Sequence, residues 1–436
     1  MDLKGKRLLV LGGSRISCEI VKHAKNMGIT VGVTDWYPLE KSPAKQLADE
    51  VYYESTSDIE AMSKLIQEKH FDGILTGFTD SVLPYYAEIC ENNGLPSYGT
   101  KEQFDIFIDK NKYKALMRKF NIPIIPEYKI DLNNIDDSAK NIKYPLLVKP
   151  SDSSGSRGIT ICNNIEELKR AIFIANNASK TKNILVEQYI DGAECTVFWI
   201  FKDGNYYMTL LGNRYVKYNQ EGVVPLPVGY TYPAAVQPRF LKETAPKMEK
   251  MFKSVGIKNG MMFMQCKIVD GECIVYDIGY RLTGTLEYIN IKEMCGFDPL
   301  DMLIRFSLTG DMGETELDKK IDPELGNKYS FNVSILSRPG KIEKIIGLDK
   351  VGNMLEVIDI VVAHPEGDVI TEDMRGLLSQ ITVRILGKAD SIEQMRNAMK
   401  CIYDSIKIIS DKGENLMISE IDDEDFKGTI LGENKS

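Results

Sequence analysis

Residues 261–281 read MMFMQCKIVDGECIVYDIGYR, two apolar runs on either side of Asp270-Gly271. An aspartate followed by glycine is typical of a tight turn between antiparallel strands. The spacing predicts a hairpin of residues 261–269 and 273–278 in which Gln265 and Asp277 face each other. A buried amide and a buried carboxylate both need polar partners, and two oxygen donors suit Mg²⁺. The alternative is a plain hydrogen bond between the two side chains inside a sheet.

The first hundred residues alternate between strand patterns and helix patterns. Apolar runs at 7–11 and 30–34 predict buried strands, and helical spacing over 16–27, 59–69 and 82–93 predicts helices. This alternation predicts an α/β unit with a parallel sheet. Gly12-Gly13-Ser14 follows the first strand, but the G-x-G-x-x-G spacing of a dinucleotide site is missing. We interpret it as a tight turn, with dinucleotide binding as the alternative.

A short polar loop separates two further strand patterns. The loop, residues 151–158, reads SDSSGSRG and follows Lys149. Small residues let backbone N–H groups approach an anion closely, and Lys149 and Arg157 add positive charge. The loop is therefore interpreted as a phosphate cradle, against the alternative of a disordered hairpin tip. It is not a Walker A loop, because G-x-x-x-x-G-K-[ST] is absent from the sequence.

Two carboxylates lie in the segment VEQYIDGAE, residues 186–194. Glu187 ends a strand pattern, where it can accept hydrogen bonds from an adenine amino group. Glu194 follows a glycine turn seven residues later, where it can accept hydrogen bonds from ribose hydroxyls. Taken as isolated residues, both are more typical of surface charges.

The composition excludes several classes of protein. The chain has 436 residues and a net charge of −9, which disfavours broad nucleic-acid binding. Its eight cysteines form no C-x-x-C pair and its three histidines lie far apart, so we expect reduced thiols and no zinc site. No apolar run approaches the roughly 18 residues of a membrane span. The start of the chain is interpreted as a strand and not a signal peptide, so a cytoplasmic protein is expected.

In this order the motifs resemble the ATP-grasp superfamily, in the branch of biotin carboxylase, carbamoyl phosphate synthetase and the carboxylate–amine ligases. The resemblance implies an ATP-grasp fold preceded by a Rossmann-like domain. It implies a first domain over 1–108, an ATP-grasp domain over 109–310 with a lid at about 127–200, and a linker over 311–328. The C-terminal lobe would be 329–436 and end in an acidic tail, the charged run at 420–425.

The resemblance also implies roles for individual residues. The nucleotide contacts that it implies are Lys110, Lys149, Ser154, Gly155, Ser156, Gly158, Glu187, Tyr189, Ile190 and Glu194. Gln265 and Asp277 match the two metal positions, and Arg281 matches the arginine that faces the acyl-phosphate. The implied cofactors are ATP and Mg²⁺.

The chain departs from the pattern of the superfamily at one metal position. The usual E-x-N-x-R reads Asp277-Ile278-Gly279-Tyr280-Arg281 here, and Gly279 offers no side-chain ligand. The biotin-substrate motifs around Arg281 are missing, so a biotin substrate is not expected. The chain contains neither a glutaminase portion nor a second ATP-grasp half, so a complete carbamoyl phosphate synthetase is excluded.

The resemblance implies an ATP-dependent carboxylate–amine ligase that works through an acyl-phosphate. The alternatives are a purine-pathway or dipeptide-forming ligase, and an ATP-binding protein without turnover. Small-molecule acid and amine substrates are expected, with contacts near Gly12, Asp35, Thr79, Asp80 and residues 214–230. No nucleic acid or membrane partner is expected, and relatives suggest a homodimer.

Overall fold

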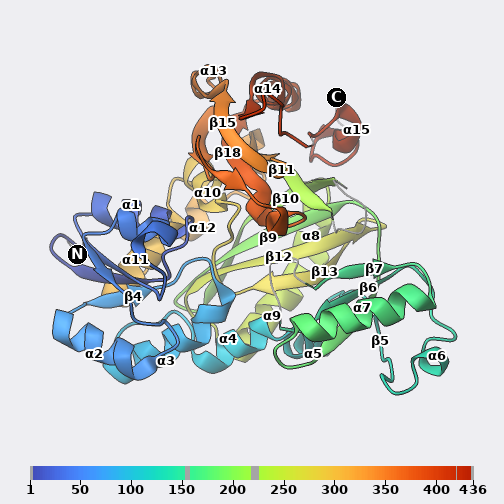
Figure 1. Cartoon of the computed structure of the whole chain (residues 1–436), viewed down its shortest axis with the longest axis horizontal. Coiled ribbons are helices and arrows are strands. Elements are labelled where there is room, and N and C mark those ends of the chain that lie inside the picture. Colours follow the sequence, from blue (N-terminus) through green and yellow to red (C-terminus); the bar gives the residue numbers. More distant parts are fainter. Residues whose placement is uncertain (1–2, 153–157, 218–224, 419, 434–436) are drawn as a thin grey trace.

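The computed structural model describes residues 3–152, 158–217, 225–418 and 420–433. The chain begins with a parallel four-stranded sheet in the order β3-β2-β1-β4, shown in blue in Figure 1. Its strands are β1 (Arg7–Leu11), β2 (Thr30–Thr34), β3 (Glu50–Tyr52) and β4 (Gly73–Leu75). The helices of this region are α1 (Ser17–Asn26), α2 (Ile59–Lys69), α3 (Leu83–Asn93) and α4 (Lys101–Ile108). The predicted parallel sheet is confirmed.

A helix from far along the chain completes this first unit. Helix α11 (Pro299–Thr309) packs on β4 and α1, although it lies more than 200 residues downstream. The approach is close, because a Cβ on Gly73 would lie 2.0 Å from the carbonyl oxygen of Ser307. The same helix is preceded by α10 (Glu287–Cys295). The first unit is therefore built from two separate parts of the sequence.

A second small sheet lies at the other end of the molecule (Figure 1). Its strands pair antiparallel in the order β5-β8-β6-β7. They are β5 (Glu127–Tyr128), β6 (Leu146–Pro150), β7 (Thr160–Cys162) and β8 (Ile184–Gln188). Helix α7 (Ile165–Ala178) packs on β6 and β7 and buries Leu168 and Ala171. Helix α5 (Lys110–Lys119) precedes this sheet, and the short helix α6 (Ile135–Ser138) lies between β5 and β6.

The centre of the molecule is an eight-stranded sheet in the order β13-β12-β9-β10-β11-β14-β18-β16. The first five strands along this order are β13 (Glu272–Gly279), β12 (Gly260–Val269), β9 (Glu194–Lys202), β10 (Asn205–Lys217) and β11 (Leu226–Tyr232). The predicted hairpin of residues 261–269 and 273–278 is confirmed as β12 and β13, which pair antiparallel. Helices α8 (Gln237–Glu243) and α9 (Ala245–Val255) pack on one face, where Trp199 meets Phe240 and Phe252.

The C-terminal lobe continues the same sheet. Its strands are β14 (Tyr329–Leu336), β15 (Gly340–Ile346), β16 (Val357–Val362), β17 (Val369–Ile370), β18 (Ile381–Ala389) and β19 (Lys407–Ser410). Of these, β14, β18 and β16 belong to the eight-stranded sheet, and the others form a separate antiparallel sheet in the order β17-β15-β19. Its helices are α13 (Leu348–Gly352), α14 (Ile392–Ser405) and α15 (Asp423–Phe426), and the connection before it holds α12 (Leu317–Lys320). β11 pairs with β14, so the lobe is joined by backbone hydrogen bonds.

The acidic run at the end of the chain keeps Asp422, Asp423 and Glu424 exposed, as expected of a solvated segment, but it is also anchored to the protein. Asp422 caps α15, and both Asp422 and Asp425 form ion pairs with Lys217 at 2.9 and 2.6 Å. Phe426 is buried against Tyr215. An aromatic anchor behind the run explains the difference, because burying one ring fixes the acidic residues around it.

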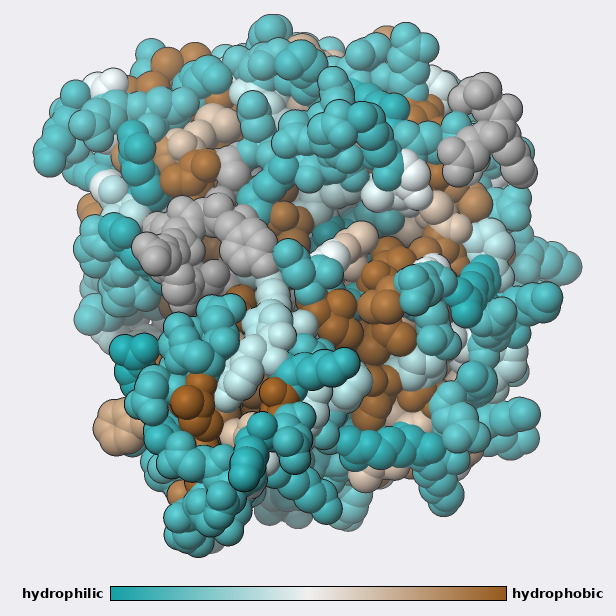
Figure 2. Space-filling view, turned by 90° about the vertical axis from the view of Figure 1, so that its right-hand side faces the viewer, coloured by the Kyte–Doolittle hydropathy of each residue, from teal (hydrophilic) through white to brown (hydrophobic). Residues whose placement is uncertain are grey.

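The surface agrees with the charged composition. Figure 2 shows hydrophilic residues over most of the face on the side of the small sheet, with hydrophobic residues gathered near its centre. Within the described ranges, none of the helices combines the length and the apolar character needed to cross a bilayer.

Candidate nucleotide and metal site

Two predicted lysines meet at the β12–β13 hairpin. Asp109 caps α5 through the backbone N–H groups of residues 111 and 112, which fixes Lys110 in the first turn of that helix. The Lys110 Nζ lies 3.7 Å from a carboxylate oxygen of Asp277. Lys149, at the end of β6, donates to the Tyr276 carbonyl oxygen at 3.3 Å. Lysines from two separate elements therefore converge on the strand that carries a predicted metal position.

A buried charge cluster surrounds Glu187. Its carboxylate lies 2.8 Å from the Lys149 Nζ and also contacts Lys114. Lys114 in turn pairs with Glu127 at 2.7 Å. Burial disfavours the charged carboxylate, but the Lys149 and Lys114 ammonium groups outweigh burial and hold the pKa of Glu187 below its ordinary value. Lys114 was not identified from the sequence, although it lies one helical turn after Lys110 and on the same helix face.

Glu194 is held by three donors. Lys267 lies 2.8 Å from Oε1, the Tyr276 hydroxyl donates to Oε2 at 2.8 Å, and Arg214 also contacts Oε2. Burial opposes ionisation, yet Arg214 and Lys267 keep the pKa of Glu194 lowered. The sequence indicated residues 214–230 as a source of contacts, but it did not indicate the Tyr276 and Lys267 partners.

Gln265 and Asp277 are paired directly across the hairpin, as the sequence predicted. Gln265 is also opposite Thr196 of β9. The Asp277 side chain keeps 37% of its exposure, so it can reach a ligand from solvent. One amide oxygen and one accessible carboxylate fit a Mg²⁺ ion that retains several waters.

An aromatic ring fills the space beside Gly279, where the pattern of the superfamily has an asparagine. Gly279 lies opposite Phe263, and a Cβ on Gly279 would lie 2.3 Å from an atom of that ring. The Phe263 ring also lies 5.0 Å from the Arg281 guanidinium carbon, a cation–π contact. Position 279 therefore has no side chain that could bind a metal, and the Phe263 ring leaves no space for one.

Arg281 is clamped to the first unit of the chain. Its Nε and Nη2 donate to the two carboxylate oxygens of Asp80 at 2.5 and 2.6 Å, and its Nη1 donates to the Leu282 carbonyl at 2.8 Å. Although burial opposes the charge, Asp80 holds the pKa of Arg281 above its ordinary value. A guanidinium has five N–H donors, so two remain for another ligand.

The predicted phosphate loop is described only in part. Ser154, Gly155, Ser156 and Arg157 lie outside the described residues. Gly158 has a φ of 72°, and a Cβ there would lie 2.6 Å from Ala178. Both facts require glycine at this position. Tyr189 and Ile190 are half-buried directly after β8, and Lys267 lies 5.8 Å from the Tyr189 ring.

The glycine turn after β1 is occupied by protein groups. The Gly13 N–H donates to Asp35 at 2.7 Å, and the Ser42 hydroxyl donates to the same oxygen at 2.8 Å. A carboxylate thus takes the position where a dinucleotide phosphate would bind, which favours the interpretation as a tight turn.

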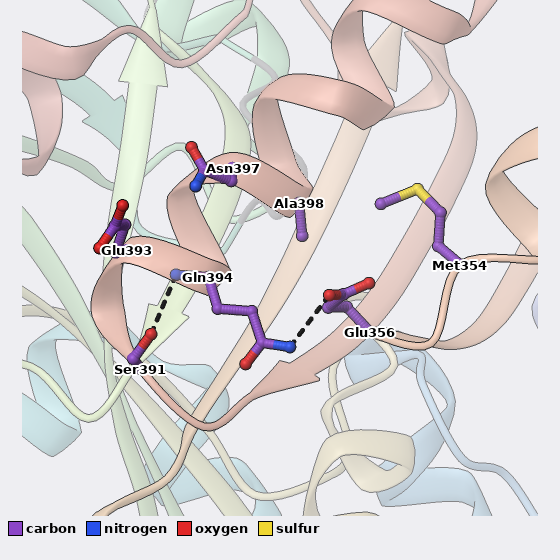
Figure 3. Close-up of a pocket in the computed structure, with 7 residues that line it drawn as sticks. All are labelled: Met354, Glu356, Ser391, Glu393, Gln394, Asn397 and Ala398. Atoms are coloured by element: carbon purple, nitrogen blue, oxygen red, sulfur yellow. Dashed lines mark hydrogen bonds between the residues drawn. The ribbon is translucent and has the colours of Figure 1, made fainter.

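A surface hollow of about 480 Å³ lies away from these residues, on the C-terminal lobe (Figure 3). Ser391 accepts from the Gln394 backbone N–H, and Gln394 donates to Glu356 at 3.0 Å. The predicted site residues lie elsewhere in the fold.

Residues 109–219 match the family model described as "Carbamoyl-phosphate synthase L chain, ATP binding domain". The 2-oxoglutarate carboxylase small subunit of Hydrogenobacter thermophilus is 28% identical over 229 residues, 48% of this chain and 48% of that protein. The carbamoyl phosphate synthase large chain of Clostridium beijerinckii is 25% identical over 338 residues, 73% of this chain and 31% of that protein. The matches thus cover about half or less of these relatives.

Solved structures share the fold. The L-amino acid ligase of Bacillus licheniformis superposes with a TM-score of 0.74 at 21% identity, covering 93% of this chain and 99% of that one. The predicted fold of a parallel-sheet domain followed by an ATP-grasp domain is therefore confirmed.

Proposed function

From the similarity of this chain to ATP-grasp proteins we propose that it is an ATP-dependent carboxylate–amine ligase. ATP would phosphorylate a carboxylate, releasing ADP, and an amine would then attack the acyl carbon and displace phosphate to give an amide. One observation carries the proposal: Lys110 and Lys149 both reach the strand that holds Asp277, at 3.7 Å from its carboxylate and 3.3 Å from the neighbouring carbonyl. Two lysine cations beside a carboxylate oxygen suit a magnesium complex of a nucleoside triphosphate.

The residues divide into those that bind and those that stabilise charge. Lys110 and Lys149 would hold phosphate oxygens as point charges. Gln265 and Asp277 would hold Mg²⁺, which when bound neutralises charge on the transferred phosphoryl group. Glu187 and Glu194 would orient the nucleoside, and the loop 151–158 would exclude water from the acyl-phosphate. Arg281 would place its two remaining N–H donors on the transferred group.

Arg281 needs no new backbone arrangement for this role. Its fork is already fixed by Asp80, and an oriented donor loses little entropy when it binds charge. The reaction needs no nucleophilic side chain, because the substrate carboxylate attacks ATP directly.

Hydroxylamine trapping tests the proposal without knowledge of the natural amine. The protein would be incubated with ATP, Mg²⁺, hydroxylamine and each member of a panel of carboxylic acids. An acyl-phosphate gives a hydroxamate, and ADP appears in equal amount. Hydroxamate with at least one acid, lost in Lys149→Ala, supports the ligase.

An ATP-binding protein without turnover is a second candidate, and Gly279 favours it. The Phe263 ring takes the space of the third ligand. ADP binding by calorimetry with no hydroxamate from any acid would favour this candidate. The homodimer and the cytoplasmic location stay predictions.

A further inference from the structure

A row of polar side chains crosses one face of the central sheet. Register pairs connect the row from strand to strand, from β12 at one side to β14 at the other. Its members are Lys267, Glu194, Arg214, Tyr230 and Asn332. Two residues further along β14, Ser334 is paired with Arg384 of β18 on the same face. The row therefore runs from the proposed nucleotide site into the C-terminal lobe.

The two arginines of this face have different surroundings. Arg214 contacts Glu194, which neutralises it. Arg384 is 7% exposed and donates to the Ser334 hydroxyl at 2.7 Å, and no carboxylate of the described residues forms an ion pair with it. A buried guanidinium without a carboxylate is costly, because it loses hydration and gains no opposite charge. Burial also lowers the pKa of Arg384, because the charged guanidinium loses hydration.

Glu287, the carboxylate whose charge acts on Arg384, is already bound by other groups. Glu287 accepts from the Thr283 backbone N–H at 2.9 Å and from the hydroxyls of Thr283 and Thr285. These bonds fix the turn that leads into α10. Burial raises the pKa of Glu287, which weakens it further as a counter-ion for Arg384.

Two more polar groups on this face have no hydrogen-bond partner among the described residues. They are the Tyr232 hydroxyl and the Asn332 Oδ1, and both side chains are fully buried. Tyr232 follows Tyr230 by two residues, so its side chain lies on the same face of β11 as the polar row. A phenolic hydroxyl can donate to an anion beside Arg384.

We propose that Arg384 binds a carboxylate of the substrate, distinct from the carboxylate that reacts with ATP. This rests on the proposed function and narrows its substrate class: either the acid or the amine carries an additional carboxylate, as an α-amino acid or a dicarboxylic acid does. The planar fork of Arg384 matches a carboxylate in two parallel hydrogen bonds. A dianionic phosphate would call for several unneutralised cations, and Arg214 is already neutralised by Glu194.

Thermal unfolding and calorimetry of the full chain test this inference with three probes, succinate, L-glutamate and L-alanine, each compared with its carboxamide. At least one carboxylate should raise the Tm of the wild type, and its carboxamide should not. Arg384→Met should weaken that binding by at least about tenfold, the effect of losing a hydrogen bond to a charged group. Arg384→Lys should recover part of it. Lys388→Met, on the same strand but paired with Glu293, should bind as the wild type does.

The ligand-free variant separates a binding role from a structural one. If the role of Arg384 is to bind a ligand, Arg384→Met should keep or raise the Tm of the protein without ligand, because it removes an uncompensated buried charge. A large fall in Tm, seen also in Arg384→Gln, would overturn the proposal. Retained carboxylate binding in either variant, or no stabilisation of the wild type by any carboxylate, would also overturn it. Stabilisation by ADP and Mg²⁺ reports separately on the nucleotide site. Its loss would count against the proposed function, whereas its presence without carboxylate binding would count against the role of Arg384 alone.

Discussion

Asp80 and Arg281 are 201 residues apart in sequence, yet their side chains form a two-point ion pair at 2.5 and 2.6 Å. Asp80 belongs to the first, parallel-sheet unit, and Arg281 follows β13, the second strand of the β12–β13 hairpin. The pair therefore fixes the first unit against the proposed phosphate site. A substrate held by the first unit would be positioned relative to Arg281 through this ion pair.

Arg281→Lys should lower turnover by at least about a hundredfold, the effect of losing one oriented donor. Lysine keeps the charge but loses the paired N–H groups that hold Asp80. ATP affinity should hardly change, so steady-state ADP formation is measured beside calorimetric ATP binding. Near wild-type turnover would contradict the role of Arg281.

Lys149→Ala and Lys110→Ala should each abolish most of the thermal stabilisation by ADP and Mg²⁺. A ligand present at a hundred times its Kd stabilises a protein by about 2.7 kcal/mol, so the wild-type shift is readily measured. Lys149→Ala also weakens the ligand-free protein, because Glu187 loses a partner, so shifts and not absolute Tm values are compared. Lys112→Ala, exposed on the same helix as Lys110, is the control. Full shifts in both variants would show that the nucleotide binds elsewhere.

Lys114→Met should cost about 3–5 kcal/mol of unfolding free energy, because it leaves the buried Glu187 and the half-buried Glu127 with fewer cations. Arg118→Met removes a partner of the same Glu127, but its side chain is 51% exposed. That control should cost about 0–1 kcal/mol. Urea unfolding at neutral pH measures both, and equal losses would refute the special position of Lys114.

Gly279→Asn should destabilise the protein by about 1–3 kcal/mol and not restore a metal ligand, because the new side chain meets the Phe263 ring. Phe263→Leu in the same chain should recover part of that loss. The double variant should also need less Mg²⁺ for activity than the wild type. Additive losses in a double-mutant cycle would show that the two positions do not compete for space.

Acid should destabilise the protein through Glu187 and Glu194. Both carboxylates have a lowered pKa in the folded state, so their stabilisation is present above the unfolded-state pKa of about 4.3 and is lost as pH falls through the folded-state value. Glu187→Gln should be less stable at pH 7 and show a shallower loss toward pH 3. Glu166→Gln, on the exposed side of α7, is the control. If stability falls with pH as steeply in Glu187→Gln as in the wild type, the lowered pKa of Glu187 is contradicted.

Local pattern predicted the elements well. The pairing of Gln265 with Asp277 follows from twelve residues of spacing around one turn, and the parallel sheet follows from alternating strands and helices. The hairpin is a contact between neighbours in sequence, and the strand and helix periods that predict the parallel sheet are encoded in each local segment.

Long-range contacts were not predicted. Lys114 has the pattern of an ordinary helix lysine until β5 and β8 bring Glu127 and Glu187 around it. The filling of the Gly279 position depends on Phe263, which has the pattern of a core residue. No local signal marks the partner of either residue, because the partner is set by the packing of separate elements.

The backbone pairing of β11 with β14 has a consequence for how this chain can be divided. Four register pairs, from Gly229↔Val333 to Tyr232↔Ser330, join the two strands. A fragment that ended before β14 would leave β11 as a bare edge with unpaired N–H and C=O groups and the aromatic Tyr230 and Tyr232 beside them. Such an edge is a template for association with other chains. Shuffling this lobe between homologous chains would succeed only at junctions that keep both strands of the pair from one parent.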